Sequence, residues 1–388
     1  MGYNMTVKKQ NSSAETKSSP KLIIASTDVS ADLLYAGGFN APDPVLYFES
    51  GGEKTLVVSP LEYARALSEA KPGVRVIEHT AFLKGKKPAD SLAASLSRKL
   101  GIDSWLVPAG FPFGEAEKLR EAGIEVHCCP EGSLYPERQV KSAAEQKAVQ
   151  RSQQATEEIM RQFRQILIDS KVNAQGYLEY RGKVLTSEFL RTELEAEFKH
   201  MGYTAGRTIF AHGPQGAEPH NLGSGPIRAN EPVVADIFPR SDSTGYWGDM
   251  TRTYVKGKAS PVVKRAFKAV LAASEAAKKM LRAGVTGAAA HQAAAEVLTQ
   301  AGFATGTGRD GKPCGFFHGL GHGVGLEIHE NPRLSPLNPN PLQSGNIVSV
   351  EPGLYYSAWG GIRLEDLVVI RLHGIRCLNT LEMELEIK

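Results

Sequence analysis

The sequence predicts two folded domains, an α/β domain at the N-terminus and an α+β domain with an internal pseudo-twofold repeat at the C-terminus. Up to about residue 137, short runs rich in β-forming residues alternate with helical stretches, as in α/β domains. Beyond that point, long amphipathic helices appear, and one pattern of helix and strands occurs twice. A chain of 388 residues is long enough for two domains.

The composition is that of an ordinary soluble globular protein and argues against several kinds of partner. Hydrophobic residues make up 41% of the chain and charged residues 22%. The net charge of +3, without a cluster of Lys and Arg, gives no sign of nucleic-acid binding. No apolar run is long enough to span a membrane, and no signal peptide is recognisable. The four cysteines form no CxxC pair, so a reducing cytoplasm is the predicted location.

The N-terminal domain is expected at residues 21–137, after a polar, Ser- and Lys-rich segment of residues 1–20 that is predicted to be a disordered leader. Helices are predicted at residues 61–70 and 89–100. The strands are predicted at residues 22–25, 45–48, 55–58, 74–77, 104–107 and 124–127. No group of catalytic residues is recognisable in this domain. We therefore interpret it as a structural or oligomerising domain that forms a wall of a site located elsewhere.

The C-terminal domain is expected at residues 138–388. It begins with a helix of residues 142–169, whose apolar side chains recur close to helical spacing. Thr186 is predicted to cap the N-terminus of the next helix and Gly202 its C-terminus. The further amphipathic helices are predicted at residues 186–201, 262–281 and 288–300.

Two segments of the C-terminal domain repeat one another. Each consists of a helix that ends in Gly and an aromatic residue, a hydrophobic strand with a carboxylate near its end, and a second strand with another carboxylate. In this pattern Asp236 corresponds to Glu351, and Asp249 corresponds to Glu365. A pseudo-twofold relation between the halves would bring the four carboxylates towards one central site.

The four acids predict a metal site. Asp236 and Glu351 follow runs of Val, Ile and Ala that are typical of buried strands. Because a buried, unpaired carboxylate is costly and no run of Lys or Arg lies beside these acids, multivalent cations are the expected counterions. Oxygen ligands with one imidazole favour Mn, Co or Zn without distinguishing among them. Four carboxylates can bridge two such ions, and a dinuclear site typically activates water to hydrolyse an amide or ester.

A glycine-rich stretch from His318 to Glu330 supplies the imidazoles. Its histidines, at 318, 322 and 329, are separated by four glycines, which disfavour a helix and favour extended or bent backbone. In an extended chain His318 and His322 point the same way, whereas His329 needs a bulge or bend to converge with them. Histidines at such a site could stabilise a tetrahedral oxyanion, and Glu351 could shuttle a proton to the leaving nitrogen.

Five motifs, in order, resemble those of the metallopeptidase family with the pita-bread fold, which includes methionine aminopeptidase, aminopeptidase P and prolidase. The motifs are AEPHNLGSGP, VVADIFPR with GYWGDMTRT, HGLGHGVGLEIHE, VSVEPGLYY and GIRLEDLVV. The resemblance covers residues 138–388. It implies two divalent metal ions (Mn, Co or Zn), both bridged by two of the carboxylates, at 249 and 365. The implied metal ligands are Asp236, Asp249, His322, Glu351 and Glu365.

The resemblance also implies roles around the metal ions. Glu351 would double as the acid/base group, and His220 and His329 would contact the scissile carbonyl and the intermediate. His318 and Arg363 are similar to substrate-binding residues of the branch that cleaves before proline. Residues 21–137 likewise resemble the N-terminal domain of prolidase, aminopeptidase P and creatinase. The expected substrate is therefore a proline-containing peptide, and a homodimer is the expected assembly.

The segment between Asp236 and Asp249 is about two residues longer than is usual in that family, which predicts a longer hairpin turn at residues 239–244. Because an insertion of two keeps the strand parity, Asp249 can still face the site. The alternatives are an aminopeptidase of another specificity, a creatinase-like amidinohydrolase and a non-catalytic binding paralogue. The complete ligand set argues against the last two. The sequence does not distinguish a dipeptidase from an aminopeptidase that acts on longer peptides.

Overall fold

The computed structural model describes residues 19–83 and 91–388 and divides into two compact units, Met1–Pro136 and Glu137–Lys388. Most of the predicted disordered leader, and the beginning of the helix predicted at residues 89–100, lie outside the described residues. Within the described ranges, no helix is long and apolar enough to cross a membrane.

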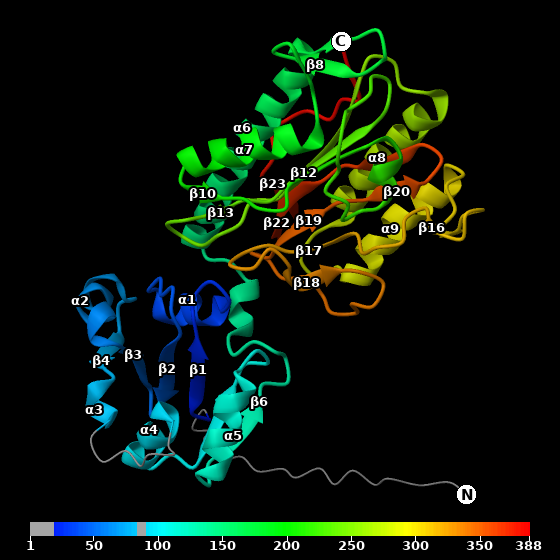
Figure 1. Ribbon diagram of the computed structural model, residues 1–388. Helices are drawn as coiled ribbons and strands as arrows, with labels where there is room; N and C mark the ends of the chain where they lie inside the picture. Colours follow the sequence, from blue (N-terminus) through cyan, green and yellow to red (C-terminus); the bar gives the residue numbers. More distant parts are fainter. Residues whose placement is uncertain (1–18, 84–90) are drawn as a thin grey trace, which may run out of the picture. The chain divides into compact units, whose positions relative to one another are not determined.

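The N-terminal unit is built on a six-stranded sheet of order β4-β3-β2-β1-β5-β6 (Figure 1). β1 pairs antiparallel with β2 and parallel with β5, so the sheet is mixed. The predicted strands are confirmed: β1 (Lys21–Ala25), β2 (Val45–Ser50), β3 (Glu53–Val58), β4 (Val74–Glu78), β5 (Ser104–Val107) and β6 (Glu125–Cys128).

Helices cover both faces of this sheet, because neighbouring residues of β1 point to opposite sides. Leu22 packs into the core that contains Trp105, together with α3 (Thr80–Leu83), α4 (Leu92–Leu100) and α5 (Phe113–Glu121). Ile23 packs on the other face with α1 (Ala31–Gly37) and α2 (Pro60–Glu69). The sequence analysis predicted α2 and α4 but missed α1, α3 and α5, which are too short for a clear helical period.

The C-terminal unit contains two larger sheets, each built mainly from one half of the repeat, and the first also receives β24 from the end of the chain. The first has the order β11-β12-β14-β24, with β11 (Ile209–His212), β12 (Val233–Ile237), β14 (Met250–Lys256) and β24 (Glu386–Ile387). The second has the order β18-β17-β19-β22-β23, with β17 (Gly321–Gly323), β18 (Glu330–Leu334), β19 (Ile347–Val350), β22 (Asp366–Arg371) and β23 (Gly374–Cys377).

Smaller sheets complete the described part of this unit. They are β7 (Lys171–Val172), β8 (Leu178–Tyr180) and β9 (Lys183–Val184); β10 (Tyr203–Thr204) with β13 (Arg240–Ser241); β15 (Gly306–Thr307) with β16 (Pro313–Cys314); and β20 (Gly353–Tyr356) with β21 (Gly360–Arg363).

The predicted helices of the C-terminal unit are confirmed as α6 (Ala143–Asp169), α7 (Ser187–His200), α8 (Pro261–Met280) and α9 (Gly287–Gln300), with short 3-10 helices η1 (Pro136–Gln139) and η2 (Gly213–Ala217). Thr186 caps α7 by accepting a hydrogen bond from the Phe189 backbone. The C-terminal cap of α7 is Met201 rather than Gly202; the glycine follows with a φ of 79°, a left-handed conformation that would strain a residue with a Cβ.

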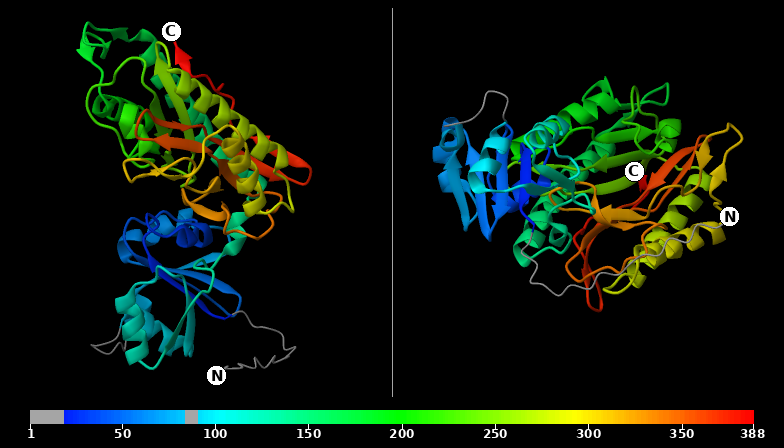
Figure 2. Two further views of the ribbon diagram at one scale, coloured as in Figure 1. Left: turned by 90° about the vertical axis from the view of Figure 1, so that its right-hand side faces the viewer. Right: turned by 90° about the horizontal axis from the view of Figure 1, so that it is seen from below.

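Each half has its own hydrophobic core. α6 and α7 pack with β12 and β14, around residues such as Phe163 and Phe198. α8 and α9 pack with β19 and β22, around residues such as Val270 and Leu298 (Figures 1 and 2). The helices thus support the strands whose ends carry the predicted acids.

Arg252 ties the two halves together. It lies on β14 with 1% of its side chain exposed and donates to Asp366 Oδ1, on β22, at 2.7 Å. The same guanidinium donates to the carbonyl oxygens of Glu365, at 2.6 Å, and Leu381, at 2.9 Å. This cation therefore connects β14 to two segments that lie more than a hundred residues further along the chain.

We expect Arg252→Met to lower the free energy of unfolding by about 3 kcal/mol, because removing one partner of a buried pair leaves desolvated acceptors behind. Lys278, which also contacts Asp366, limits the loss. Guanidinium unfolding followed by circular dichroism measures the change. Arg228→Met, at an exposed arginine that donates to Tyr177, is the control and should shift stability by less than about 0.5 kcal/mol. Equal losses in both variants would contradict this account of Arg252.

Candidate metal centre and active site

One cavity of the C-terminal unit, of about 820 Å³, is lined by every residue that the sequence analysis predicted for the site. The acids and Arg363 come from the strand ends of both halves, and the histidines come mainly from the glycine-rich stretch. The lining includes Asp236, Asp249, Glu351, Glu365, His220, His318, His322, His329 and Arg363.

The most buried part of the cavity holds Asp249, His322 and Glu365. Each offers a ligand atom within 4.8 Å of those of the other two. His322 Nε2 lies 3.7 Å from Asp249 Oδ2 and 3.2 Å from Glu351 Oε1. His322 Nδ1 lies 3.2 Å from the Gly323 carbonyl oxygen, a contact suited to an N–H donor that leaves Nε2 directed at the acids.

Neighbouring side chains fix these ligand atoms, and the sequence analysis missed them. Gln153, buried on α6, bonds both the backbone N–H and the backbone carbonyl of Asp249, each at 2.8 Å. Thr251 donates to Glu365 Oε2 at 2.8 Å. Ser349 accepts from the His322 backbone N–H at 3.0 Å and donates to Glu351 Oε1 at 3.2 Å. Gln153 shares the buried face of α6 with Ser152, Thr156 and Glu157, so its place in the sequence did not single it out.

Asp236 is paired with an arginine, Arg363, which the resemblance implied as a substrate-binding residue. Arg363 Nη2 donates to Asp236 Oδ2 at 2.7 Å, and Arg363 Nη1 donates to Tyr355 Oη at 3.0 Å. No run of Lys or Arg lies beside the acids in the sequence, and it is β21 that brings this single arginine to β12.

His318 is held in one tautomer by two protein groups. Its Nδ1 lies 2.7 Å from the Gly319 carbonyl oxygen and therefore carries the hydrogen. Its Nε2 lies 2.9 Å from Tyr355 Oη and accepts from it, since that hydroxyl already accepts from Arg363. Burial lowers the pKa of His318, which keeps the ring neutral. Tyr355, fully buried, was also missed by the sequence analysis.

The acids differ in how well the protein stabilises their charge. Burial, followed by repulsion from the other carboxylates, raises the pKa of Asp249 and of Glu365 well above the usual range. Burial also acts to raise the pKa of Glu351, but the hydrogen bond and charge of His322 outweigh it and lower the pKa to about 2. Among the described residues, Arg363 is the only Arg or Lys that forms an ion pair with one of the four acids.

The glycine-rich stretch bends as predicted. The pairing of β17 with β18 shifts register between Gly321 and Gly323, and the chain then turns so that the rings of His322 and His329 meet at 4.4 Å, perpendicular to each other. A Cβ on Gly321 would lie 2.0 Å from the carbonyl oxygen of Ser349, so only glycine allows this strand approach. Burial of its ring, with the nearby His322 and Arg333, lowers the pKa of His329 to about 4.

The predicted longer hairpin turn is present between β12 and β14. Ser241 and Gly245 close its tip through a backbone hydrogen bond of 2.9 Å, and Gly248 donates to the Pro239 carbonyl oxygen at 2.9 Å. Asp249, next along the chain, is 4% exposed and lines the cavity. The insertion therefore leaves Asp249 facing the site.

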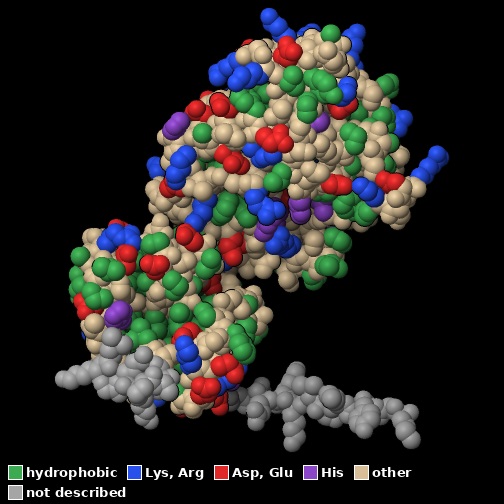
Figure 3. Space-filling view, in the orientation of Figure 1, with side chains coloured by type: hydrophobic (Ala, Val, Ile, Leu, Met, Phe, Trp, Pro, Cys, Tyr) green, Lys and Arg blue, Asp and Glu red, His purple; other side chains and the backbone are tan. Residues whose placement is uncertain are grey.

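The outer part of the cavity is apolar on one side and basic on another. Its apolar lining comes from Ile209, Pro219, Leu222, Phe238, Phe317 and Ile328. Its exposed polar lining includes His220, His329, Arg207 and Arg333. Figure 3 shows His side chains gathered beside Lys or Arg side chains on one face of this unit. The buried acids and the exposed guanidiniums thus occupy different depths.

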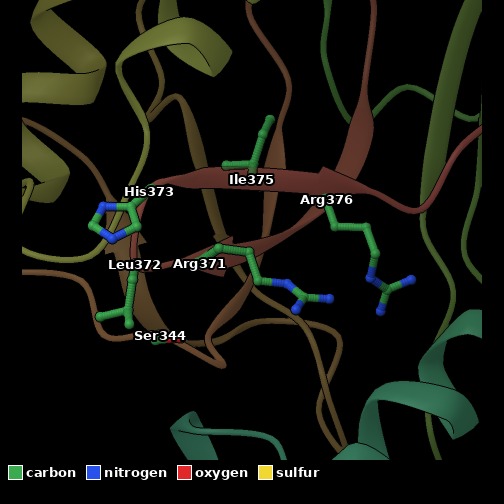
Figure 4. A pocket seen from close by; sticks show the side chains of 6 residues that line it. All are labelled: Ser344, Arg371, Leu372, His373, Ile375 and Arg376. Carbon is green, nitrogen blue, oxygen red and sulfur yellow. The ribbon is translucent and has the colours of Figure 1, made fainter.

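A second hollow, of about 570 Å³, lies at the β22–β23 hairpin. Figure 4 shows the side chains of Arg371 and Arg376 side by side along it, with His373 at the turn. None of its lining residues is acidic, and repulsion from Arg371 adds to burial in lowering the pKa of Arg376. This hollow therefore lacks the ligands of a cation site, and the first cavity is the candidate active site.

The sequence that builds this site also matches a known protein family. Residues 144–371, more than half of the chain and all four acids, match the model of metallopeptidase family M24. The chain belongs to this family. Solved structures with the same fold include the X-Pro aminopeptidase of Thermotoga maritima, with a TM-score of 0.77, 24% identity, and coverage of 95% of this chain and 97% of that one. The predicted α/β unit and pita-bread unit are confirmed.

Relatives of this M24 chain extend over nearly its whole length. The Xaa-Pro dipeptidase of Pyrococcus horikoshii is 28% identical over 338 residues, which cover 87% of this chain and 86% of the relative. The solved dipeptidase PepE of Mycobacterium ulcerans is 28% identical, with a TM-score of 0.75, and covers 95% of this chain and 93% of its own. The similarity therefore includes both units.

In the presence of a chelator, we expect Asp249→Asn to raise the midpoint of thermal unfolding by about 2–4 °C. This rise corresponds to a gain of roughly 1 kcal/mol in the free energy of unfolding. The raised pKa of Asp249 means that its ionised form destabilises the folded state at neutral pH, so a neutral isostere relieves the repulsion. Differential scanning calorimetry at pH 7 measures the change. Asp366→Asn, at an acid paired with Arg252 and Lys278, is the matched control and should lower the midpoint. A similar loss in both variants would count against the repulsion.

Proposed function

We propose that this chain hydrolyses the peptide bond that precedes proline, using water activated by two divalent metal ions. One observation carries the proposal: five side chains of metal-binding type converge in a single cavity that also has an apolar wall. The names of full-length relatives, such as the Xaa-Pro dipeptidase of Pyrococcus horikoshii, support the choice of substrate. The proposed metal ligands are Asp236, Asp249, His322, Glu351 and Glu365.

The residues present fit a pair of divalent cations. Four carboxylates and one imidazole surround the buried part of the cavity, and one guanidinium pairs with one of the acids. The raised pKa values of Asp249 and Glu365 indicate a deficit of positive charge between them. Oxygen and imidazole ligands without a thiolate suit Mn, Co or Zn; manganese is one of these candidates.

When bound, the metal ions would supply Lewis acidity to polarise the scissile carbonyl and to lower the pKa of a water molecule. The chain's own groups would handle the proton and the oxyanion. Glu351, a carboxylate at the buried end of the cavity, would take the proton of the attacking water and deliver it to the leaving nitrogen. His329 and His220, at the exposed part of the cavity, would donate hydrogen bonds to the scissile carbonyl and the tetrahedral intermediate.

The apolar wall would receive the proline ring. Phe238, Phe317 and Ile328 offer hydrocarbon surface beside the buried acids. The proline nitrogen lacks a hydrogen, so the site needs no hydrogen-bond acceptor for it. The substrate-binding role of His318 and Arg363 stays a prediction, and we propose a second task for both. Their bonds to protein groups would hold Tyr355 and Asp236 in place.

We further propose that the enzyme prefers dipeptides. Arg207 and Arg333 place two exposed guanidiniums at the cavity, within the same lining as the apolar wall, and could pair with the carboxylate that follows proline in an Xaa-Pro dipeptide. Arg207 adopts a positive φ of 63°, a strained conformation that is more frequent at functional sites than elsewhere. The cytoplasmic location and the homodimer remain predictions from the sequence; the four cysteines, all without disulfides, fit a reducing compartment.

Metal-stripped protein should cleave Ala-Pro only after manganese or cobalt is added. Hydrolysis is followed by the release of proline, with Ala-Ala as the substrate control and Asp249→Asn as the ligand variant. We expect the variant to remain folded by circular dichroism but to lose metal uptake and at least about 10³-fold in turnover. Turnover by the stripped protein, or equal cleavage of Ala-Ala, would contradict the proposal. Metal binding without cleavage of either peptide would instead favour another amide substrate.

Replacing Arg333 tests the preference for dipeptides. For Ala-Pro, Arg333→Met should lower kcat/KM by roughly 10–100-fold, since a charge-assisted hydrogen bond contributes about 1.5–3 kcal/mol. For Ala-Pro amide, which has no carboxylate, the same variant should change kcat/KM by less than about threefold. Steady-state kinetics with Ala-Pro, Ala-Pro amide and Ala-Pro-Ala decide the question. Faster cleavage of the tripeptide by the wild type would indicate an aminopeptidase instead.

A further inference from the structure

A buried ion pair lies outside the lining of the active-site cavity. Lys141, just before α6, donates through Nζ to Glu330 Oε1, and the exposed fractions of the two side chains are 1% and 4%. Burial lowers the pKa of Lys141, although Glu330 opposes the shift. Neither residue lines the cavity, and neither is used in the proposed reaction.

Stability alone is a weak reason for such a pair. Desolvating two charges costs about as much as their attraction returns, and apolar side chains of similar size often stabilise a core equally well. A buried pair is better suited to fixing one arrangement of the segments that it joins. The segments joined here therefore indicate what the pair does.

On one side, Glu330 holds the turn that carries His329. Its second carboxylate oxygen accepts from the Glu327 backbone N–H at 3.4 Å. Gly325 lies against the same carboxyl group, so closely that a Cβ on that glycine would be 2.6 Å from Oε1. His329 directly precedes Glu330, and its ring meets that of His322 at 4.4 Å. The carboxylate of Glu330 thus defines the path of residues 325–330.

On the other side, Lys141 is attached to a rigid part of the fold. Its backbone N–H donates to the Gly345 carbonyl oxygen at 2.9 Å, and its carbonyl oxygen accepts from Gln146 on α6 at 2.9 Å. A capping box starts α6 at the next residue, Ser142. Arg138 adds a second tie to the same turn, since its Nη2 donates to Glu327 Oε2 at 2.6 Å.

We propose that Lys141, acting through Glu330, is a positioning residue that holds the 325–330 turn so that the His329 imidazole faces the reacting carbonyl. His329 is the only one of the four cavity-lining histidines that reaches the site from this turn. The proposal rests on the proposed function, in which His329 contacts the substrate. A displacement of about 1 Å at such a group can cost roughly 100-fold in rate.

Lys141→Met keeps the length of the side chain and removes its charge. We expect kcat for Ala-Pro to fall by about 10–100-fold, with KM and bound metal little changed, because the hydrogen bond from His329 strengthens as charge develops on the carbonyl oxygen. Adding His329→Ala to Lys141→Met should lower kcat no further than His329→Ala alone does, since both changes remove the same contribution, that of the His329 imidazole. A wild-type kcat in Lys141→Met, or losses that multiply in the double variant, would overturn the proposal.

Two further variants separate positioning from stability. Lys141→Met/Glu330→Leu replaces the pair with apolar side chains and should recover stability without recovering kcat. Lys21→Met, which breaks a partly buried Lys–Glu contact in the N-terminal unit, is the control and should leave kcat unchanged. Recovery of kcat together with stability in the apolar double variant would show that the pair is merely structural.

A readout that does not depend on turnover keeps this inference separate from the proposed function. In protein labelled with ¹³C-histidine, the ring signals of His329, assigned by their loss in His329→Ala, should shift or broaden in Lys141→Met. The signals of His291, which stacks on Phe316 away from the turn, should stay in place. Unmoved His329 signals would overturn the positioning role. Absence of Xaa-Pro cleavage in the wild type would refute only the proposed function.

Discussion

The structure depends above all on four carboxylates held close together in a largely buried cavity. Burial and mutual repulsion both oppose their ionisation, and the pKa values of Asp249 and Glu365 are raised accordingly. A protein gains no stability from such an arrangement by itself. The arrangement of acids becomes favourable when cations bind. Because the protein already fixes the ligand atoms, cation binding needs little reorganisation of the site.

The fold provides this fixation from both halves of the repeat. Each half ends its strands at the cavity and supports them with its own pair of helices. Side chains from α6, β14 and β19 then hold individual ligands: Gln153 bonds the backbone of Asp249, Thr251 bonds Glu365, and Ser349 links His322 to Glu351. Arg252 joins the two sheets behind the acids. The ligands therefore rest on strands that both cores and these hydrogen bonds hold in place.

The sequence predicted the acids, the histidines and the principal helices because each depends on a local pattern. Repeated strands with a terminal carboxylate located Asp236 and Glu351, and glycine spacing located the bend before His329. What it could not predict were pairings across the fold. Arg363 reaches Asp236, and Lys141 reaches Glu330, over more than a hundred residues of chain. Such contacts leave no periodic trace, and only the packing of distant strands and loops creates them.

The depth of each charge then determines how a small peptide could lie in the cavity. The carboxylates and the metal ions they would hold occupy the buried part, while the guanidiniums of Arg207 and Arg333 are exposed. Between them the imidazoles of His318 and His329 stay neutral, since the pKa of each is lowered. A zwitterionic dipeptide would therefore place its amino end towards the acids and its carboxylate towards the guanidiniums. The peptide bond then falls beside the neutral His329 imidazole, whose hydrogen bond can follow the charge that develops on the carbonyl oxygen.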